Sequence, residues 1–354
     1  MKILTVLGAR PQFIKAAAVS REFRQYPFIK ESIVHTGQHY DTNMSDIFFR
    51  QMEIPYPDHR LETGGLSQGA MTGRMLENIE KIINSENPDK VMVYGDTNST
   101  LAGALAAVKL HVPVVHVEAG LRSFNMAMPE EVNRILTDQV SSLLCCPTET
   151  AIKNLKNEGF FTKDVKIVNT GDVMQDVAYY FADKSVKPEG LFANKSQKII
   201  LCTLHRAENT NDEKRLENIC NAISQLSERY HVVLPLHPRT QKAIEKAKIK
   251  LNANIIKPVG YFEMLYLLKA ASLVLTDSGG LQKEAYFFSK PCVTMRDQTE
   301  WTELIDQQAN VLVGAGVDSI ITEVNSMLTK DIAYNKDTYG GGSAARWVVE
   351  SIVK

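Results

Sequence analysis

Net charge and long apolar runs are both scarce in this sequence. Its 354 residues carry 40 Lys and Arg against 41 Asp and Glu, which gives a formal net charge of −1. A chain so balanced lacks the positive field with which proteins bind nucleic acid or an anionic membrane. The apolar run from Ile3 to Leu7 is too short for the core of a signal peptide, and no stretch reaches the about 18 apolar residues of a membrane-spanning helix. We therefore expect a cytoplasmic protein without a nucleic-acid or membrane partner, in which a few local groups bind any anion.

Cysteine is also scarce, and its positions form no metal-binding pattern. Neither a CxxC pair nor a Cys/His ligand spacing occurs among the five cysteines, at 145, 146, 202, 220 and 292. We interpret them as buried reduced thiols. The sequence has no Walker-type GxxxxGK loop, and its GxG spacings at Gly314 and Gly340 lack either the third glycine or the preceding strand of a dinucleotide site. We therefore expect no metal and no cofactor.

Short β-branched runs alternate along the chain with longer segments of helical periodicity. Twelve such runs are candidate strands: 2–8, 31–37, 90–96, 112–118, 142–148, 165–171, 198–204, 231–237, 254–260, 273–279, 291–297 and 310–316. Continuous apolar strands separated by helices predict parallel sheets that are covered on both faces. Six strands precede residue 171 and six follow it, so the fold class is α/β, with two Rossmann-like doubly wound domains facing across a cleft. Ligands of such folds bind at the carboxyl ends of the strands.

Acidic residues follow several of these strands. Asp96 is the last residue of the run 90–96, Glu118 is the last residue of the run 112–118, and Glu130 and Glu131 follow Pro129 at the expected start of a helix. Carboxylates at neighbouring strand ends can converge for general acid/base chemistry and for stabilising a cationic sugar centre. The alternatives are helix caps, exposed charges or a metal site. Glu130 and Glu131 cannot both face one pocket from adjacent helical positions.

Phosphate-binding features occupy the second half. Ser278, Gly279 and Gly280 lie between a strand and a helix, where glycine lets a phosphate approach the backbone N–H groups. Glu284 lies further along the same helix, and a carboxylate there suits the two hydroxyls of a ribose. The alternative is a tight turn with a solvated glutamate. Basic groups that can neutralise a diphosphate also follow strands: Arg10, Lys15, His205, Arg206, His237, Arg239 and Arg296. We expect acids of the first half at the sugar and most bases at the diphosphate.

The ordered motifs together resemble the non-hydrolysing UDP-N-acetylglucosamine 2-epimerase family. They run through GARPQFIKAA, TGQHYD, YGDTNSTLAGALAA, HVEAGLRS, MPEEVNRILTD, LHRAEN, LPLHPRT, LTDSGGLQKEA and the terminal YGGG segment. The resemblance implies a glycosyltransferase-B-like fold in which the last helix returns to the first domain. The expected domains are thus 1–171 with the helix 343–354, and 172–342. The resemblance also implies a UDP-sugar partner and a homodimer.

The resemblance also implies a reaction. UDP is eliminated across C1–C2 of the sugar, the bound 2-acetamidoglucal is reprotonated on the other face at C2, and UDP returns to C1. The catalytic residues implied are Asp96, Glu118 and Glu130, with His205 stabilising or protonating the departing phosphate. The residues implied to hold UDP are Arg10, Lys15, His237, Ser278, Gly279, Gly280, Glu284 and Arg296. The sequence does not assign the acid that removes the C2 proton.

Three departures leave the sugar open. The common GTRPE and TERPE motifs are replaced around Gln12 and Trp301, and the loop between Glu118 and Pro129 is short. These features resemble the subgroup that acts on UDP-2,3-diacetamido-2,3-dideoxyglucuronic acid. A second, activating substrate site of the family is matched at Gln38, His39 and Arg74 but not at Asp41.

The first hypothesis is therefore a UDP-GlcNAc 2-epimerase that makes UDP-ManNAc for surface polysaccharide, and the diacetamido-uronate enzyme is the alternative. A glycosyltransferase of the same fold, a hydrolysing epimerase and a nucleotide-sugar sensor are the more distant hypotheses.

Overall fold

The computed structural model describes residues 1–38, 49–50, 52–191 and 197–354, which divide into two α/β units. The first unit contains Met1–Val177 and Lys336–Lys354, and the second contains Ala178–Asn335. The boundaries expected from the sequence, after residues 171 and 342, lie a few residues from the observed boundaries, which follow Val177 and Asn335. The Asp172 N–H donates to Tyr339 O, and Gly171 packs against the same residue, so both segments are joined to the first unit at these points.

The first unit is built on a seven-stranded parallel sheet in the order β3-β2-β1-β4-β5-β6-β7. Its strands are β1 (Lys2–Leu7), β2 (Lys30–His35), β3 (His59–Arg60), β4 (Lys90–Tyr94), β5 (Val114–Val117), β6 (Leu143–Cys146) and β7 (Lys166–Asn169). Its helices are α1 (Arg10–Phe23), α3 (Gln68–Glu86), α4 (Asn98–Lys109), α5 (Pro129–Val140), α6 (Glu149–Asn157) and α15 (Ala344–Val353), with 3-10 turns at Phe160–Thr162 and Lys336–Tyr339. Helix α7 (Val173–Phe181) begins in this unit and ends in the second.

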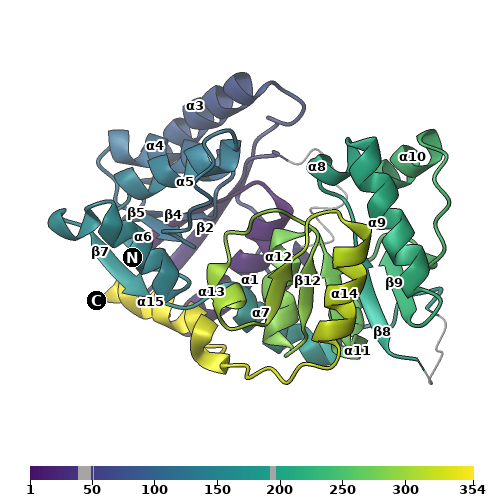
Figure 1. Cartoon of the computed structure of the whole chain (residues 1–354). Coiled ribbons are helices and arrows are strands. Elements are labelled where there is room, and N and C mark those ends of the chain that lie inside the picture. The colour runs from purple at the N-terminus through teal and green to yellow at the C-terminus, as the bar shows by residue number, and fades with distance from the viewer. Residues whose placement is uncertain (39–48, 51, 192–196) are drawn as a thin grey trace. The chain divides into compact units, whose positions relative to one another are not determined.

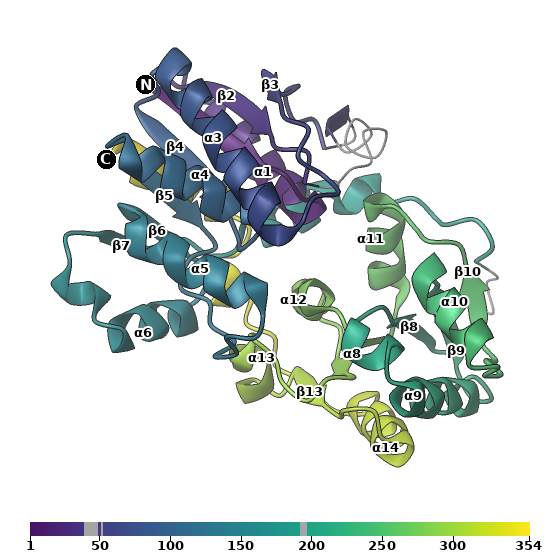
Figure 2. The same ribbon diagram turned by 90° about the horizontal axis from the view of Figure 1, so that it is seen from above.

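Helices cover both faces of the first sheet. Helices α3, α4 and α5 lie side by side on one face, and α1 packs against α15 on the other (Figures 1 and 2). Leu4 and Val6 of β1 are fully buried in a cluster with Met75 and Ile79 of α3. Burial on both faces is the reason that the strands are continuously apolar.

The second unit holds a six-stranded parallel sheet in the order β10-β9-β8-β11-β12-β13. Its strands are β8 (Ile199–Thr203), β9 (His231–Pro235), β10 (Asn254–Ile256), β11 (Leu273–Thr276), β12 (Cys292–Thr294) and β13 (Asn310–Leu312). Its helices are α8 (Ala207–Thr210), α9 (Glu213–Leu226), α10 (Pro238–Lys246), α11 (Tyr261–Ala270), α12 (Gly279–Phe287), α13 (Thr302–Asp306) and α14 (Val317–Met327), with a 3-10 turn at Ala182–Lys184.

Alternate residues of β8 face the two layers of the second unit. Ile200 and Cys202 pack in a cluster with α9 and α14, while Leu201 packs with α11 and α12. All twelve expected strands are present, and β3 is an addition with only two residues. No helix in the described residues is long and apolar enough to cross a membrane.

Candidate functional site

Asp96 lies in the turn between β4 and α4 of the first unit. Gly95 turns the chain with a φ of 63°, and Thr97 caps α4 by accepting a hydrogen bond from the Thr100 N–H. The Asp96 carboxylate pairs with Arg134 of α5, and its backbone carbonyl accepts from Asn133 Nδ2 at 2.9 Å. Its side chain stays 28% exposed, so the carboxylate remains accessible from outside.

Glu118 ends β5 in a strained backbone conformation. Its φ is 71°, a left-handed value that is uncommon for a residue with a side chain and recurs at functional sites. The N–H groups of Glu118 and Ala119 both donate to Cys145 O at 3.0 Å, which holds the turn. The carboxylate pairs with Lys15 Nζ of α1, and both side chains are only 9% exposed.

Gly95 brings these two acidic strand ends together. A Cβ atom on Gly95 would lie 3.1 Å from Glu118 Oε2 and 3.1 Å from Lys15 Nζ. The turn that carries Asp96 is therefore adjacent to the Lys15–Glu118 pair. Within this unit Asp96 and Glu118 each have a basic partner, Arg134 and Lys15, and the expected division of acids at the sugar and most bases at the diphosphate stays a prediction. A carboxylate removed from water needs such a partner.

The adjacent glutamates of α5 have different environments. Glu130 is exposed in the first turn of the helix, whereas Glu131 is fully buried. Glu131 accepts hydrogen bonds from Ser123 N, Ser123 Oγ and Phe124 N, each at 2.9 Å, and from Arg134 at 3.1 Å. Glu131 thus fixes the loop before α5, and the accessible carboxylate belongs to Glu130.

The loop after β1 is attached to the loop after β4 by Gln12. Its side-chain oxygen accepts from Gly8 N at 2.8 Å and Ala9 N at 3.0 Å, and its amide donates to Tyr94 O at 2.9 Å. Arg10 begins α1 beside this loop and is partly buried.

Two residues of the expected second site, Gln38 and Arg74, lie among the described residues. Gln38 accepts from Ser99 N at 3.1 Å and Ser99 Oγ at 2.7 Å, so it lies at the start of α4. Arg74 is exposed on α3. His39 lies outside the described residues.

His205 of the second unit is held by Asp277, which is fully buried. Asp277 accepts from the backbone N–H groups of His205 at 3.0 Å and Arg206 at 2.8 Å, and His205 Nδ1 lies 3.2 Å from its Oδ1. This places the ring proton on Nδ1 and leaves the lone pair on Nε2. Burial lowers the pKa of His205, Asp277 opposes the shift, and Arg206 and His237 add to it.

The Ser278–Gly279–Gly280 turn lies at the start of α12. Ser278 is the N-cap, and Gly279 and Gly280 are the first two helical residues. A Cβ atom on Gly279 would lie 2.6 Å from Glu300 Oε1, whereas a Cβ atom on Gly280 would meet nothing within 4 Å. Gly280 therefore leaves open space above the N–H groups, which favour an anion. Glu284 is buried further along α12.

Arg296 and His237 occupy different environments in the same unit. Arg296 is buried, with Glu300 Oε2 at 3.2 Å and Glu208 Oε1 at 3.5 Å from its nitrogens. His237 is exposed at the start of α10, where its Nδ1 accepts from Arg239 N at 3.2 Å.

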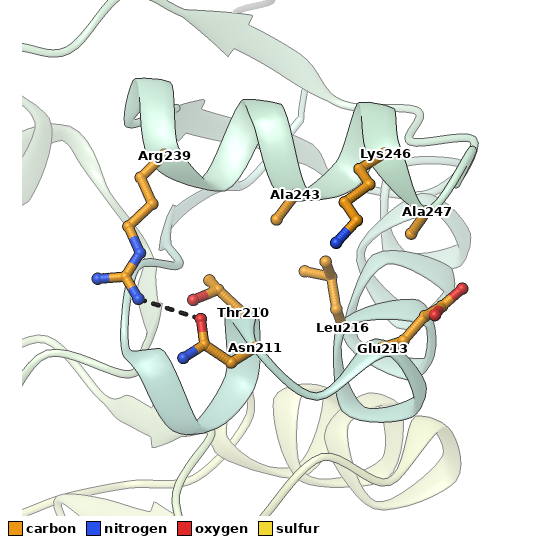
Figure 3. A pocket seen from close by; sticks show the side chains of 8 residues that line it. All are labelled: Thr210, Asn211, Glu213, Leu216, Arg239, Ala243, Lys246 and Ala247. Atoms are coloured by element: carbon orange, nitrogen blue, oxygen red, sulfur yellow. Dashed lines mark hydrogen bonds between the residues drawn. The ribbon is translucent and has the colours of Figure 1, made fainter.

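A cavity of about 400 Å³ lies between α8, α9 and α10 (Figure 3). At one end Arg239 donates to Asn211 Oδ1 at 3.0 Å, and Lys246 and Glu213 lie at the other. Of the basic groups that the sequence offers for a diphosphate, the cavity contains only Arg239, and it contains none of the residues that the family resemblance implies, so we do not place the site there. Among the described residues, no group of three or more His, Cys, Asp or Glu is arranged to hold a metal ion.

Sequence reasoning did not assign a role to several residues that organise these sites. They are Gln12, Arg134, Asp138 and Asp277. Asp277 precedes the Ser278–Gly279–Gly280 turn, so its position directly after a strand was an available signal. The other three act through partners distant in sequence, and no local pattern reveals such pairs.

Comparison with known proteins gives one consistent family. The family described as UDP-N-acetylglucosamine 2-epimerase matches residues 21–353. The UDP-2,3-diacetamido-2,3-dideoxy-D-glucuronate 2-epimerase of Pseudomonas aeruginosa is 59% identical, with 100% of each chain covered.

Solved structures agree along the whole chain. The UDP-GlcNAc 2-epimerase of Methanocaldococcus jannaschii, in complex with UDP-GlcNAc and UDP, matches with a TM-score of 0.88 and 41% identity over 100% of this chain and 99% of that one. The Neisseria meningitidis UDP-GlcNAc 2-epimerase bound to UDP-GlcNAc matches with 0.89 and 31%, covering 100% of both. A calicheamicin glycosyltransferase, with a TM-score of 0.53 and 14% identity over 99% and 97% of the two chains, shows the fold alone. The predicted fold class of two Rossmann-like domains of the glycosyltransferase-B type is confirmed.

Proposed function

The chain belongs to the UDP-N-acetylglucosamine 2-epimerase family, and from this premise we propose that it interconverts UDP-GlcNAc and UDP-ManNAc without net hydrolysis. Its relatives are epimerases, so the chain is an isomerase. The observation that carries the proposal is the pair of acidic strand ends, where Asp96 and the strained Glu118 adjoin across Gly95.

The proposed chemistry is an elimination followed by an addition. A carboxylate takes the C2 proton, the C1–O bond breaks, its electron pair leaves with UDP, and a C1=C2 double bond forms. A proton then returns to the opposite face of C2 while a UDP oxygen bonds to C1. Positive charge develops at C1 in both steps, and nearby carboxylates stabilise it. Asp96, Glu118 and Glu130 are the proposed acid/base and charge-stabilising groups.

The second unit supplies the proposed UDP-binding groups. The open N–H groups at Gly279 and Gly280 suit a phosphate, and Glu284 suits the ribose hydroxyls. His237, Ser278 and Arg296 complete the UDP set in this unit, to which the proposal adds Arg10 and Lys15 from α1. Because the Nδ1 proton of His205 is directed toward Asp277, its Nε2 must be protonated to donate to the departing phosphate.

A second sugar is favoured by one observation. Identity to the diacetamido-glucuronate enzyme is 59%, compared with 41% to the Methanocaldococcus UDP-GlcNAc enzyme. The two sugars share the UDP group and the 2-acetamido group and differ at C3 and C6. The same elimination and addition serve both.

Deuterium exchange distinguishes these functions. The protein is incubated in D2O with UDP-GlcNAc or with the diacetamido-uronate, and C2 is followed by NMR. Reversible deuterium uptake with intact UDP-sugar supports epimerisation, and the sugar that exchanges faster is the substrate. Net release of UDP with free ManNAc would refute the non-hydrolysing reaction.

A matched pair on β4 tests the site. Asp96 follows the carboxyl end of β4, and Asp89 precedes its amino end, where it accepts from Lys2 N at 2.6 Å. We expect Asp96→Asn to bind UDP normally but to lose nearly all turnover, about 10²-fold or more for loss of a general acid or base. Asp89→Asn is the control and keeps the wild-type rate. A folded Asp96→Asn variant with near wild-type turnover would contradict the assignment.

The proposal has three further parts: a homodimer, a cytoplasmic location, and binding of a second substrate molecule near Gln38, His39 and Arg74. The family resemblance supports the first and third, and the apolar-run pattern supports the second. Light scattering measures the oligomeric state, and cell fractionation measures the location. The dependence of rate on UDP-sugar concentration tests the second substrate molecule.

A further inference from the structure

A buried network lies beneath the turns that carry Asp96 and Glu118, and Asp138 of α5 is at its centre. Asp138 is fully buried. Its Oδ1 lies 2.7 Å from His116 Nδ1, and its Oδ2 accepts from Arg122 Nη1 at 2.7 Å and from Gly120 N at 3.1 Å. One carboxylate thus contacts β5 and the loop that follows Glu118.

The ring of His116 connects this carboxylate to the turn before Asp96. His116 is fully buried in β5, and its Nε2 lies 2.7 Å from Gly95 O. A backbone carbonyl only accepts hydrogen bonds, so Nε2 carries a proton. Asp138 Oδ2 accepts from a guanidinium and from a backbone N–H, which favours the carboxylate, and a carboxylate oxygen against Nδ1 calls for a second ring proton there. The contacts therefore define a buried imidazolium.

Asp138, His116 and Arg122 are buried, whereas Glu158, which pairs with Arg122, is 31% exposed. Arg122 also donates to both oxygens of Glu158, at 2.7 and 2.8 Å, so the network contains two carboxylates and one guanidinium besides His116. Burial opposes ionisation of Asp138, but His116 and Arg122 outweigh it and lower its pKa. Burial raises the pKa of the neighbouring Cys146 thiol far above its usual value, so it stays neutral. Beyond Gly95, the Lys15–Glu118 pair is itself neutral overall.

We propose that Asp138 is a positioning residue that holds His116 as a permanent imidazolium and thereby fixes the turns that carry Asp96 and Glu118. The inference rests on the proposed function, since it assigns these turns to catalysis. Through His116, Asp138 fixes the Gly95 carbonyl, and through the Gly120 N–H it fixes the turn after Glu118. The imidazolium also places a fixed positive charge beneath the carboxylates, and prearranged charge of this kind is effective in a site shielded from water.

The charge state is tested on the wild-type protein without any assay of activity. Histidine is labelled with 15N, and long-range 1H–15N NMR spectra are recorded from pH 5.5 to 9. His116→Gln identifies the resonances by their disappearance. We expect both His116 ring nitrogens to stay protonated throughout. A ring that becomes neutral within this range would overturn the imidazolium.

The positioning role is tested by kinetics. Asp138→Asn removes the negative charge that the imidazolium faces. We expect kcat to fall about 10²-fold, as for a misplaced catalytic group, with UDP binding unchanged. The remaining kcat of Asp138→Asn should fall further as the pH rises and His116 loses its proton. The pH profile of the variant then shows an ionisation that the wild type lacks, and a merely structural defect would not create it. His116→Gln should lower kcat without that ionisation, and it serves if Asp138→Asn does not fold.

His59→Gln is the matched control, since His59 Nε2 also contacts a carboxylate, Glu86 Oε1 at 2.9 Å, in the same unit. It should keep the wild-type rate. Folded Asp138→Asn and His116→Gln variants with the kcat of the control would overturn the positioning role. If the wild-type protein epimerises neither sugar, the proposed function and the positioning role fail together, while the NMR spectra still decide the charge of His116.

Discussion

The adjacent glutamates of α5 offer a sharp test, because one change should affect stability and the other catalysis. In Glu131→Gln, an amide NH2 replaces one carboxylate oxygen. Ser123 N, Ser123 Oγ and Arg134 share Oε2, and Phe124 N uses Oε1. The best arrangement of the amide keeps the shared oxygen and turns its NH2 toward the Phe124 N–H. One partly buried donor then loses its acceptor, and Arg134 loses the charge of its partner Glu131.

These losses give the expected magnitude. An unsatisfied buried N–H costs about 1–3 kcal/mol, and weakening a buried ion pair adds to it, so we expect a loss of about 3 kcal/mol in the free energy of unfolding. For a unit of this size, that corresponds to a decrease in Tm of roughly 6–12 °C. Glu130→Gln changes an exposed side chain and should shift the free energy of unfolding by less than about 0.5 kcal/mol. Its turnover should instead fall about 10²-fold or more, as for loss of an acid or base.

Calorimetry and near-UV circular dichroism measure unfolding, and deuterium exchange at C2 measures turnover, for both variants and the wild type. Equal Tm values for the wild type and Glu131→Gln would refute the reasoning about the buried carboxylate. A Glu130→Gln variant that is destabilised but retains its turnover would refute the assignment of the Glu130 carboxylate to catalysis.

Two further predictions concern pH and the phosphate site. Burial raises the pKa of Asp176 to about 6, although it accepts the N–H groups of Ala344 and Ala345 at the start of α15. A raised pKa adds stability at low pH that is lost as the pH rises through about 6, so from pH 7.5 to pH 5 the wild type should gain about 1 kcal/mol relative to Asp176→Asn in denaturant titrations. Gly280→Ala should leave Tm unchanged but weaken UDP binding about tenfold or more, because its Cβ enters the open space above the N–H groups. Gly279→Ala should lower Tm, because its Cβ would meet Glu300. Scanning calorimetry measures Tm and titration calorimetry measures UDP binding for the two variants. Equal changes of Tm and of UDP binding in the two variants would contradict the assigned geometry.

The strands were predictable because each is a continuous apolar run, and the strand ends were predictable because polar groups follow those runs directly. Asp96 and Glu118 lie where the pattern indicates, and so does the Ser278–Gly279–Gly280 turn. The two-residue strand β3 was not predictable, because it has no apolar pattern and exists only through pairing with the end of β2. The sequence groups Lys15 with the UDP-binding bases, but in the structure its Nζ pairs with Glu118, more than a hundred residues away.

By itself the sequence determined the two parallel sheets, the family and the residue types at the strand ends, because these depend on local periodicity and on ordered motifs. Only the tertiary structure decided which charges meet. It buried Glu131 and exposed Glu130, paired Lys15 with Glu118, and placed Asp138 against His116. The physical reason is desolvation: an ionised group enters the interior only beside a partner, and packing of distant elements chooses that partner.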